Sequence, residues 1–337
     1  MELKRYRETI EMYDAEGTRL TPWAEVRFHP LTGEISRIIQ VPLRKLDLPD
    51  LEKMAAETRA TCPFCPEHLG PKTPKFDTAL LPGGELRRGR VVLIPNRFPY
   101  DRYCALIILS DRHYVPLDAW HPREIADALM VGQTFLNRVM EHDPTVQAFS
   151  LNWNYAPPSG SSILHPHIQL SAGAFATNRA RRLFHATRGG GDPFAELLET
   201  EETLGQRWCE RTGAWHTLFA FAPRSRFFEL NLIHASPDCF LSLDPDQILS
   251  LSKGITRALR FVTAMGFSSM NLSLFSLLRE PKGFHPMVSI SPRACVGPYQ
   301  MSDISFQMLI DEFFSVFLPE KVAERYRENW EGPAPAA

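Results

Sequence analysis

Two histidines and a glutamine alternate near the middle of the chain, at His165, His167 and Gln169. Alternate side chains of a β-strand share one face, so these three polar groups are expected to project together, while the apolar residues between them face the other way. Pro166 cannot donate to a ladder, which indicates an edge strand or a strand start. The Ser-Gly-Ser-Ser segment at residues 159–162 offers backbone N–H groups that suit a phosphate. The pattern indicates a phosphate-handling site, and the alternative is a partly exposed strand with incidental histidines.

A Cys-x-x-Cys pair, Cys62 and Cys65, stands well before this strand. Such a pair places two thiolates on one tight turn, which is half of a tetrahedral zinc site. A redox-active pair fits less well, because prolines flank the motif and no helix-forming run follows it. Two inert cysteines are the remaining alternative. The candidates for the other two ligands are His68, His113, His121 and His165.

The composition of the chain is that of an ordinary globular protein, with 44 % hydrophobic and 23 % charged residues. Its 337 residues are enough for two domains or two fused halves, and the net charge of −2 gives no reason to expect nucleic acid or an anionic membrane as a partner. No apolar run is long enough to span a bilayer, and the charged N-terminus lacks a secretory segment. Six scattered cysteines do not form a disulfide framework, so a reducing cytoplasm is the expected location.

The expected order of elements occurs twice along the chain. Each time, a strand, a turn and a second strand lead to an amphipathic helix, an asparagine-bearing strand and a His-Pro strand. The His-Pro-His run at residues 165–167 has its counterpart in His-Pro-Met at residues 285–287. The repetition predicts an α+β fold of two fused halves, each an antiparallel sheet packed with helices, related by internal duplication.

The boundaries follow from this order. The first helix is expected over residues 118–143, and the second begins at Asp244, where an Asp-Pro-x-Gln run is typical of a helix N-terminus. The stretch before the second half lacks clear periodicity, apart from a helix expected over 196–211. Two further helices are expected over 305–317 and 321–330. The predicted organisation is a first half at 1–185, a connector at 186–216, a second half at 217–330 and a disordered tail at 331–337.

Taken together, these residues resemble the histidine-triad superfamily, and within it the galactose-1-phosphate uridylyltransferase branch. That branch also contains nucleoside-diphosphate-sugar phosphorylases and diadenosine tetraphosphate phosphorylases. The similarity covers nearly the whole chain: residues 27–34 are similar to the branch's N-terminal segment, and residues 95–99 to its nucleotide-contacting turn. The most specific match is an asparagine, a Gly/Ser loop and a His-Pro-His-x-Gln run, here Asn154, Gly160, Ser161, Ser162, His165, His167 and Gln169.

The resemblance implies that two histidine-triad-like halves carry one nucleotidyltransferase site. His167 would attack the α-phosphorus of a nucleoside-diphosphate sugar and hold the nucleoside monophosphate covalently, until hexose 1-phosphate or phosphate takes it. Gln169 and Ser162 would assist by hydrogen-bonding the phosphate oxygens. Glutamine cannot act as a general acid, which is consistent with transfer to phosphate in preference to water. The implied nucleotide and phosphate contacts are Arg27, Asn96, Arg97, Phe98, Asn154, Gly160, Ser161, Ser162 and Gln169.

The resemblance also implies one structural zinc ion and a homodimer acting in galactose metabolism. The implied zinc ligands are Cys62, Cys65, His113 and His165, with His68 as a rival for the fourth position. A second metal site is expected to be absent, because residues 285–289 lack a histidine and an acidic residue that relatives carry. Arg97 stands where uridylyltransferases tend to carry an acidic residue, so the resemblance leaves the identity of the nucleobase open. The alternative functions are a dinucleoside polyphosphate phosphorylase and a catalytically silent nucleotide-binding protein.

Overall fold

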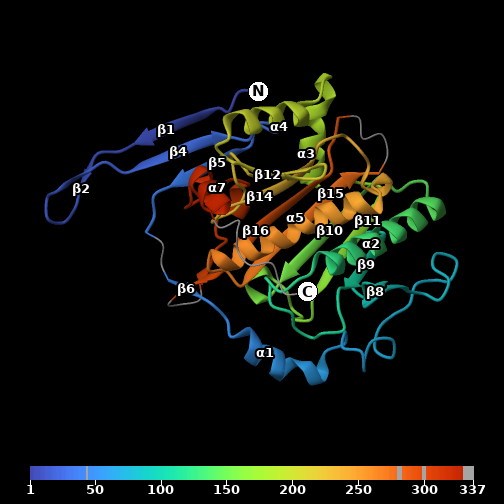
Figure 1. The fold of residues 1–337 in the computed structure, drawn as a ribbon. Coiled ribbons are helices and arrows are strands. Elements are labelled where there is room, and N and C mark those ends of the chain that lie inside the picture. Colours follow the sequence, from blue (N-terminus) through green and yellow to red (C-terminus); the bar gives the residue numbers. More distant parts are fainter. Residues whose placement is uncertain (43–44, 279–282, 298–300, 329–337) are drawn as a thin grey trace.

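The computed structural model describes residues 1–42, 45–278, 283–297 and 301–328 (Figure 1). The tail predicted to be disordered, 331–337, lies outside these residues. None of the helices described is both long and apolar enough to cross a bilayer.

A ten-stranded sheet forms the centre of the described part of the chain, and every pairing within it is antiparallel (Figure 1). The strand order is β12-β13-β14-β16-β15-β10-β11-β9-β8-β7. The strands are β7 (Leu86–Arg88), β8 (Val91–Pro95), β9 (Tyr103–Ile108), β10 (Ala148–Tyr155), β11 (His167–Gly173), β12 (Trp208–Thr212), β13 (Trp215–Phe219), β14 (Leu230–His234), β15 (Ser269–Leu277) and β16 (Met287–Arg293).

Equivalent strands of the two halves follow in the same order from either edge of the sheet, so the duplication is present in the structure as well as in the sequence. The first half contributes β7-β8-β9-β11-β10 and the second β12-β13-β14-β16-β15, and β10 pairs with β15 along its whole length. Helices α2 (Pro122–His142) and α5 (Pro245–Ala264) hold equivalent places in the two halves and pack against each other (Figure 1). The predicted α+β fold of two fused halves is confirmed, with the two halves sharing one sheet.

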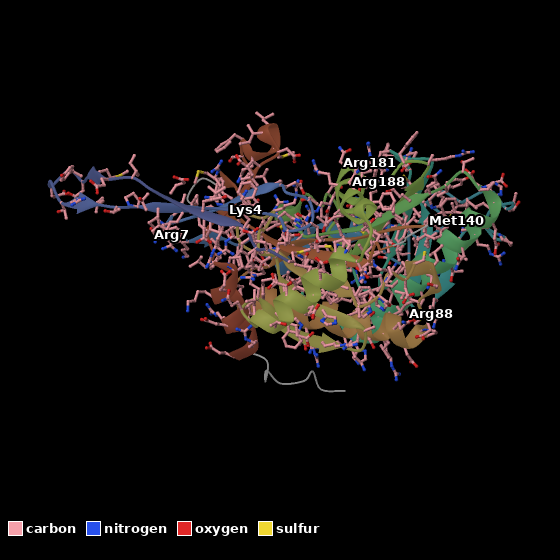
Figure 2. The ribbon with its side chains drawn as sticks, turned by 90° about the horizontal axis from the view of Figure 1, so that it is seen from above. Lys4, Arg7, Arg88, Met140, Arg181 and Arg188 are labelled. Atoms are coloured by element: carbon pink, nitrogen blue, oxygen red, sulfur yellow. The ribbon has the colours of Figure 1, made fainter. Side chains whose placement is uncertain are left out.

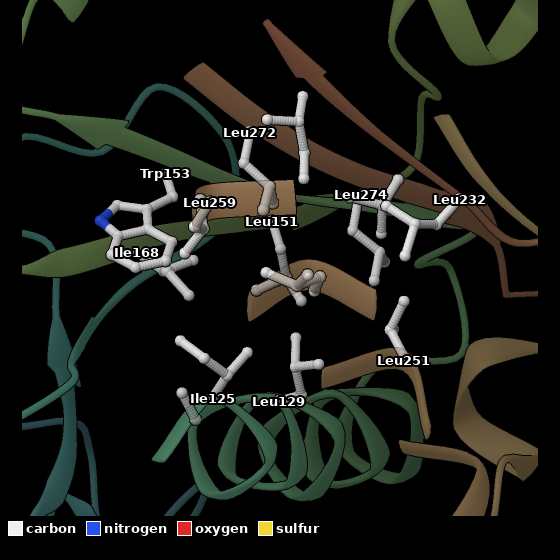
Figure 3. Close-up of a cluster of buried hydrophobic side chains, with 14 of the residues drawn as sticks. Ile125, Leu129, Leu151, Trp153, Ile168, Leu232, Leu251, Leu259, Leu272 and Leu274 are labelled. Atoms are coloured by element: carbon white, nitrogen blue, oxygen red, sulfur yellow. The ribbon is translucent and has the colours of Figure 1, made fainter. Parts of the chain in front are cut away.

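The face of the sheet under α2 and α5 is apolar. Figure 3 shows Ile125 and Leu129 of α2 opposite Leu151 of β10, all of them buried. Because strand side chains alternate, the residues next to Leu151 and Trp153 point to the other face, which is polar where β10, β11 and β15 meet. The residues on this second face next to the central strand pair are Asn152, Asn154, His167, Gln169, Asn271 and Ser273.

The helix starts follow capping chemistry. Asp244 accepts from the Gln247 N–H and the Gln247 side chain accepts from the Asp244 N–H, so the predicted N-terminus of α5 is confirmed. His121 caps α2 in the same way. Its ring accepts from the Arg123 N–H, and the Glu124 side chain accepts from the backbone N–H of His121. The candidate metal ligand His121 is therefore an N-cap.

Two segments differ from expectation. The predicted connector 186–216 contains helix α4 (Pro193–Leu204) and edge strand β12, and helix α3 (Asn178–Ala186) precedes it. The helix expected over 196–211 is wrong beyond Leu204, where Gly205 ends α4 with a positive φ of 61°. The helix expected over 305–317 is one turn, α6 (Gln307–Ile310), followed by β19 (Phe313–Ser315). Helix α7 (Pro319–Glu328) agrees with the helix expected over 321–330.

The N-terminal residues form an arm that projects from the body, with Lys4 and Arg7 on it and Met140 at the opposite end of the molecule (Figures 1 and 2). The arm belongs to a second sheet of order β1-β4-β5-β19, and β2 pairs with β3 beyond it. The strands are β1 (Arg5–Thr9), β2 (Met12–Tyr13), β3 (Arg19–Leu20), β4 (Trp23–Phe28) and β5 (Ile35–Ile39). The small remaining elements are β6 (Leu46–Asp47), α1 (Leu51–Thr58), β17 (Cys295–Val296) and β18 (Met301–Ser302).

A buried ion network ties this second sheet to the body. The Arg27 guanidinium is fully buried and donates to Glu25 at 2.7 Å and to Glu320 of α7 at 2.9 Å. Arg207 also donates to Glu320, at 2.6 Å, and pairs with the buried Glu201 of α4. Removing one member of such a network leaves its partners charged and desolvated.

Replacing Arg27 with methionine should lower the free energy of unfolding by about 3–5 kcal/mol, because buried Glu25 and partly buried Glu320 each lose their hydrogen bonds to a fully buried guanidinium. Replacing Arg37, whose pair with Glu312 is partly exposed, should lower it by less than about 1 kcal/mol. Denaturant unfolding of the two variants measures both values. Equal losses would contradict the structural role assigned to Arg27.

Candidate functional site

Two cysteines and two histidines form a buried cluster beside the start of β11. Their ligand atoms, from Cys62, Cys65, His113 and His165, lie within 4.8 Å of one another. The Cys65 sulfur is 3.4 Å from Nδ1 of His113 and 3.7 Å from Nδ1 of His165. Tetrahedral zinc with two sulfur and two nitrogen ligands separates sulfur from nitrogen by about 3.5 Å, so the donor set fits zinc.

The second nitrogen of each cluster histidine is held by oxygen. Nε2 of His165 donates to the Ser110 carbonyl at 2.8 Å. The Thr58 hydroxyl donates to the Met54 carbonyl, so its oxygen accepts from Nε2 of His113 at 3.0 Å. Both Nδ1 atoms are thereby left as lone-pair donors facing the sulfurs, the usual arrangement around a bound metal.

Burial sets the protonation of the cluster. It lowers the pKa of His165 to about 4, which keeps the imidazole neutral and able to ligate. Burial, together with the neighbouring Cys62 thiol, raises the pKa of Cys65 to about 12. A free thiol here would stay protonated at neutral pH, whereas a bound cation holds it as a thiolate.

The rival ligand His68 lies outside the cluster. Its Nδ1 donates to the Cys62 carbonyl at 2.7 Å, so the ring braces the Cys62–Cys65 turn from behind. Cys62 and Cys65 sit with Phe64 in a small apolar core on the sheet face opposite α2.

His167 opens strand β11 inside the sheet, so Pro166 marks a strand start and not an edge. Its Nδ1–H donates to the His165 carbonyl at 2.9 Å, which leaves Nε2 with a free lone pair. Desolvation by burial lowers the pKa of His167 and keeps the ring neutral. The Phe64 ring meets it edge-on, with ring centres 5.2 Å apart. The arrangement presents a neutral nitrogen nucleophile in a fixed orientation.

A pocket of about 440 Å³ opens at His167. Three parts of the chain line it: the segment after Cys62, the β8–β9 turn, and the loop and strand around His167. The lining residues are Pro63, Phe64, Lys72, Thr73, Pro74, Ile94, Pro95, Asn96, Arg97, Phe98, Tyr100, Leu106, Ser162, Ile163, His167 and Gln169. The segment held by the two cysteines is therefore one wall of the pocket that contains His167.

The pocket is positively charged. Lys72 and Arg97 line it, and no residue of its lining is acidic. Neither side chain forms an ion pair with a described residue, although Arg97 lies near the Phe98 ring, 5.9 Å from its centre. Phe98 itself is 79 % exposed and offers an aromatic face. Two unpaired cations and an open aromatic ring suit an anionic ligand with a flat group.

The structure brings most of the predicted contacts together. Asn96, Arg97, Phe98, Ser162 and Gln169 line the pocket with His167. The other predicted loop contacts, Asn154, Gly160 and Ser161, belong to the adjoining strand and loop. Arg27 does not reach the pocket, because its guanidinium is buried in the ion network described above.

Sequence reasoning missed four residues of the pocket lining: Phe64, Lys72 and Thr73 in the segment after Cys62, and Tyr100 in the β8–β9 turn. Lys72 and Thr73 follow the Cys-x-x-Cys motif closely, and the metal site itself could have indicated that this segment is pinned beside His167. Tyr100 comes just after the predicted contact Phe98 and donates to the Ser171 hydroxyl at 3.1 Å.

The loop that leads to His167 has unusual backbone geometry. Gly160 adopts a φ of +89°, which glycine tolerates. Ala156 adopts a φ of +66° with a ψ of 163°, a region that residues with a Cβ rarely enter. Hydrogen bonds hold it there: the Ser159 N–H and hydroxyl both donate to the Ala156 carbonyl.

In the second half, Met287 stands at the position of His167. His285 is buried: its Nδ1 donates to the His234 carbonyl at 2.6 Å, and its Nε2 faces the Asp192 carboxylate at 2.9 Å. Asp192 also caps α4, so this pair fastens α4 to the sheet.

Comparison with known proteins gives three informative likenesses, while no protein-family model matches the chain. An uncharacterized protein from Archaeoglobus fulgidus is 30 % identical over 314 residues, which cover 91 % of this chain and 92 % of that protein. A galactose-1-phosphate uridylyltransferase from Streptomyces lividans is 25 % identical over 230 residues, 64 % of this chain and 57 % of that enzyme. An ADP-glucose phosphorylase from Arabidopsis thaliana, solved with bound ADP-glucose, has the same fold, with a TM-score of 0.69 at 19 % identity, covering 90 % of this chain and 99 % of that one.

The purified protein should contain one metal ion per chain, measurable by elemental analysis. Replacing His113 with alanine should release the ion and lower the melting temperature, because it removes one of four ligands. The matched control is His68→Ala, which should keep the ion, since His68 lies outside the cluster. Loss of metal in the His68 variant, with retention in the His113 variant, would mean that His68 and not His113 is the metal ligand.

Proposed function

We propose that the chain is a nucleotidyltransferase of the galactose-1-phosphate uridylyltransferase branch of the histidine-triad superfamily, and that it transfers a nucleoside monophosphate from a nucleoside-diphosphate sugar to hexose 1-phosphate or inorganic phosphate. The transfer passes through a nucleotidyl-histidine at His167. The observation that carries the proposal is the free Nε2 of this buried, neutral imidazole at the base of a cationic pocket.

The proposed reaction has two displacements at the α-phosphorus. In the first, the Nε2 lone pair of His167 forms a bond to phosphorus while the bond from phosphorus to the bridging oxygen breaks, and hexose 1-phosphate leaves with that electron pair. In the second, a phosphate oxygen of the acceptor attacks, and the electrons of the N–P bond return to Nε2. The Nδ1 proton stays on its hydrogen bond to the His165 carbonyl throughout. Such a covalent route predicts ping-pong kinetics.

The polar groups of the pocket suit this chemistry. A phosphate monoester has a second pKa of about 6, so it leaves without being protonated and no general acid is required. Gln169, which can only hydrogen-bond, is therefore adequate beside His167. Ser162, Lys72 and Arg97 supply further donors and positive charge for the oxygens that carry the developing charge.

A zinc ion in the cluster would have a structural role. Two cysteines and two histidines would supply all four protein ligands of such an ion, which would leave no position for substrate. By holding Cys62 and Cys65 against His165, the ion would fix the wall from Pro63 to Pro74 beside His167.

A second candidate function is phosphorolysis of dinucleoside polyphosphates, which uses the same nucleophile with a different leaving group. The observation in its favour is the pair of unpaired cations, Lys72 and Arg97, in a pocket lining without a carboxylate. A longer phosphate chain would gain more from these charges than a diphosphate does. A third candidate, a silent nucleotide-binding protein, predicts binding without a covalent intermediate.

The protein incubated separately with UDP-glucose, ADP-glucose and diadenosine tetraphosphate should gain the mass of one nucleoside monophosphate from its donor, as read by intact-protein mass spectrometry. His167→Ala should gain no mass and should keep its metal, because position 167 is not in the cluster. Metal loss in this variant would mean that the roles of the two histidines are exchanged. A wild-type protein that binds the donors but never gains mass would be the silent binder.

Lys72→Ala and Arg97→Ala should each raise KM for the labelling donor roughly ten-fold or more, because a charge-assisted hydrogen bond is worth about 1.5–3 kcal/mol. Lys75→Ala is the matched control, since Lys75 pairs with Glu85 outside the pocket and should leave KM unchanged. Steady-state kinetics with the three variants measures the difference. An unchanged KM in both pocket variants would show that Lys72 and Arg97 do not bind the donor.

A further inference from the structure

A line of hydrogen-bonded side chains runs from the second half of the protein to the candidate site. Asp303 accepts from Nε and Nη2 of Arg293, at 2.7 and 2.8 Å. Nη1 of Arg293 donates to Oδ1 of Asn271 at 2.6 Å. Nδ2 of Asn271 donates to Oδ1 of Asn154 at 2.7 Å and to the Ser159 carbonyl at 3.0 Å. Asn154 and Asn271 are register partners across β10 and β15, where the two halves join.

The charge at one end of this line sets the orientation of every amide in it. A guanidinium can only donate, so Asn271 must turn its oxygen toward Arg293 and its nitrogen toward Asn154. Asn154 must then offer its oxygen to Asn271 and direct its own nitrogen elsewhere. Polarisation along such a chain strengthens each bond, and the largely buried Arg293–Asp303 pair keeps the direction from reversing.

The free end of the line lies on the same face of the sheet as the proposed nucleophile. Asn152 pairs with Gln169 across β10 and β11. Asn154 follows Asn152 by two residues, and His167 precedes Gln169 by two, so both side chains lie on that face at the same end of the strand pair. Nδ2 of Asn154 has no hydrogen-bond partner among the described residues. An amide nitrogen here can donate to a phosphate oxygen, whereas a reversed amide would point lone pairs at it.

We propose that Asn271 and Arg293 are positioning residues, which hold the Asn154 amide as a donor toward the phosphate at His167 and fix the start of the Ser159–Ser162 loop. The proposal rests on the nucleotidyl transfer proposed above. It gives the second half a part in the chemistry, although that half has a methionine, Met287, at the position equivalent to His167.

The nearly isosteric variant Asn271→Asp separates this role from a merely structural one. Aspartate still accepts from Arg293, but it cannot donate, so Asn154 should reverse and turn its nitrogen away from the site. Asn271→Ser is the second variant, because it removes both amide hydrogen bonds without adding a charge to the strand pair. The matched control is Ser273→Ala, which removes the neighbouring bond from β15 to β10, from the Ser273 hydroxyl to Asn152 at 2.9 Å.

The test measures the single-turnover rate of nucleotide attachment, with whichever of UDP-glucose or ADP-glucose labels the wild type, alongside KM, melting temperature and metal content. Both Asn271 variants should be slower by roughly 10- to 100-fold, with KM within about two-fold, because the donor acts on charge that develops in the transition state. The Ser273 variant should keep the wild-type rate.

A wild-type rate in the folded Asn271 variants would overturn the positioning role and leave the proposed function intact. An equal loss in Ser273→Ala would also overturn it, since the effect would then belong to strand pairing in general. Failure of every donor to label the wild type would overturn the proposed function itself.

Discussion

One residue, His165, joins the candidate metal site to the proposed nucleophile. The imidazole of His165 faces the two cysteine sulfurs, while its carbonyl accepts the Nδ1 proton of His167 at 2.9 Å. A shift of His165 would disturb both the Cys62, Cys65, His113 and His165 cluster and the orientation of Nε2 of His167. The rest of the site is arranged around it: Phe64 packs edge-on against both rings, and the segment that carries Phe64 continues into the cationic wall at Lys72.

The duplicated fold is consistent with the proposal that one half carries the nucleophile and the other half positions a group beside it. Strands β10 and β15 pair along their length, so polar residues of both halves lie on one face of one sheet. The opposite face is covered by α2 and α5, whose apolar side chains pack against it (Figure 3). Asn271 of β15 consequently contacts Asn154 of β10 directly. A positioning role for the second half needs no nucleophile of its own at Met287.

Sequence patterns predicted the features of the site that residues close together in the chain form. Strand alternation placed His167 and Gln169 on one face, and the capping residues placed the start of α5. Family resemblance, not spacing, supplied His113 and His165 as partners for the cysteines. The pairing of β10 with β15, the contact from Asn271 and the pocket wall at Lys72 depend on residues far apart in the chain, which periodicity does not report. The apolar run after Ser305 resembled a helix, yet β19 pairs with β5 instead, because a distant strand offered hydrogen bonds.

The central claim is that the nucleotide is bonded to His167 between donor and acceptor. The stereochemical course at the α-phosphorus tests it most directly, with a donor whose α-phosphate is a chiral phosphorothioate. Each in-line displacement inverts the configuration at phosphorus, so two successive displacements predict overall retention. Overall inversion would mean that the acceptor attacks the donor directly, which would contradict a nucleotidyl-histidine.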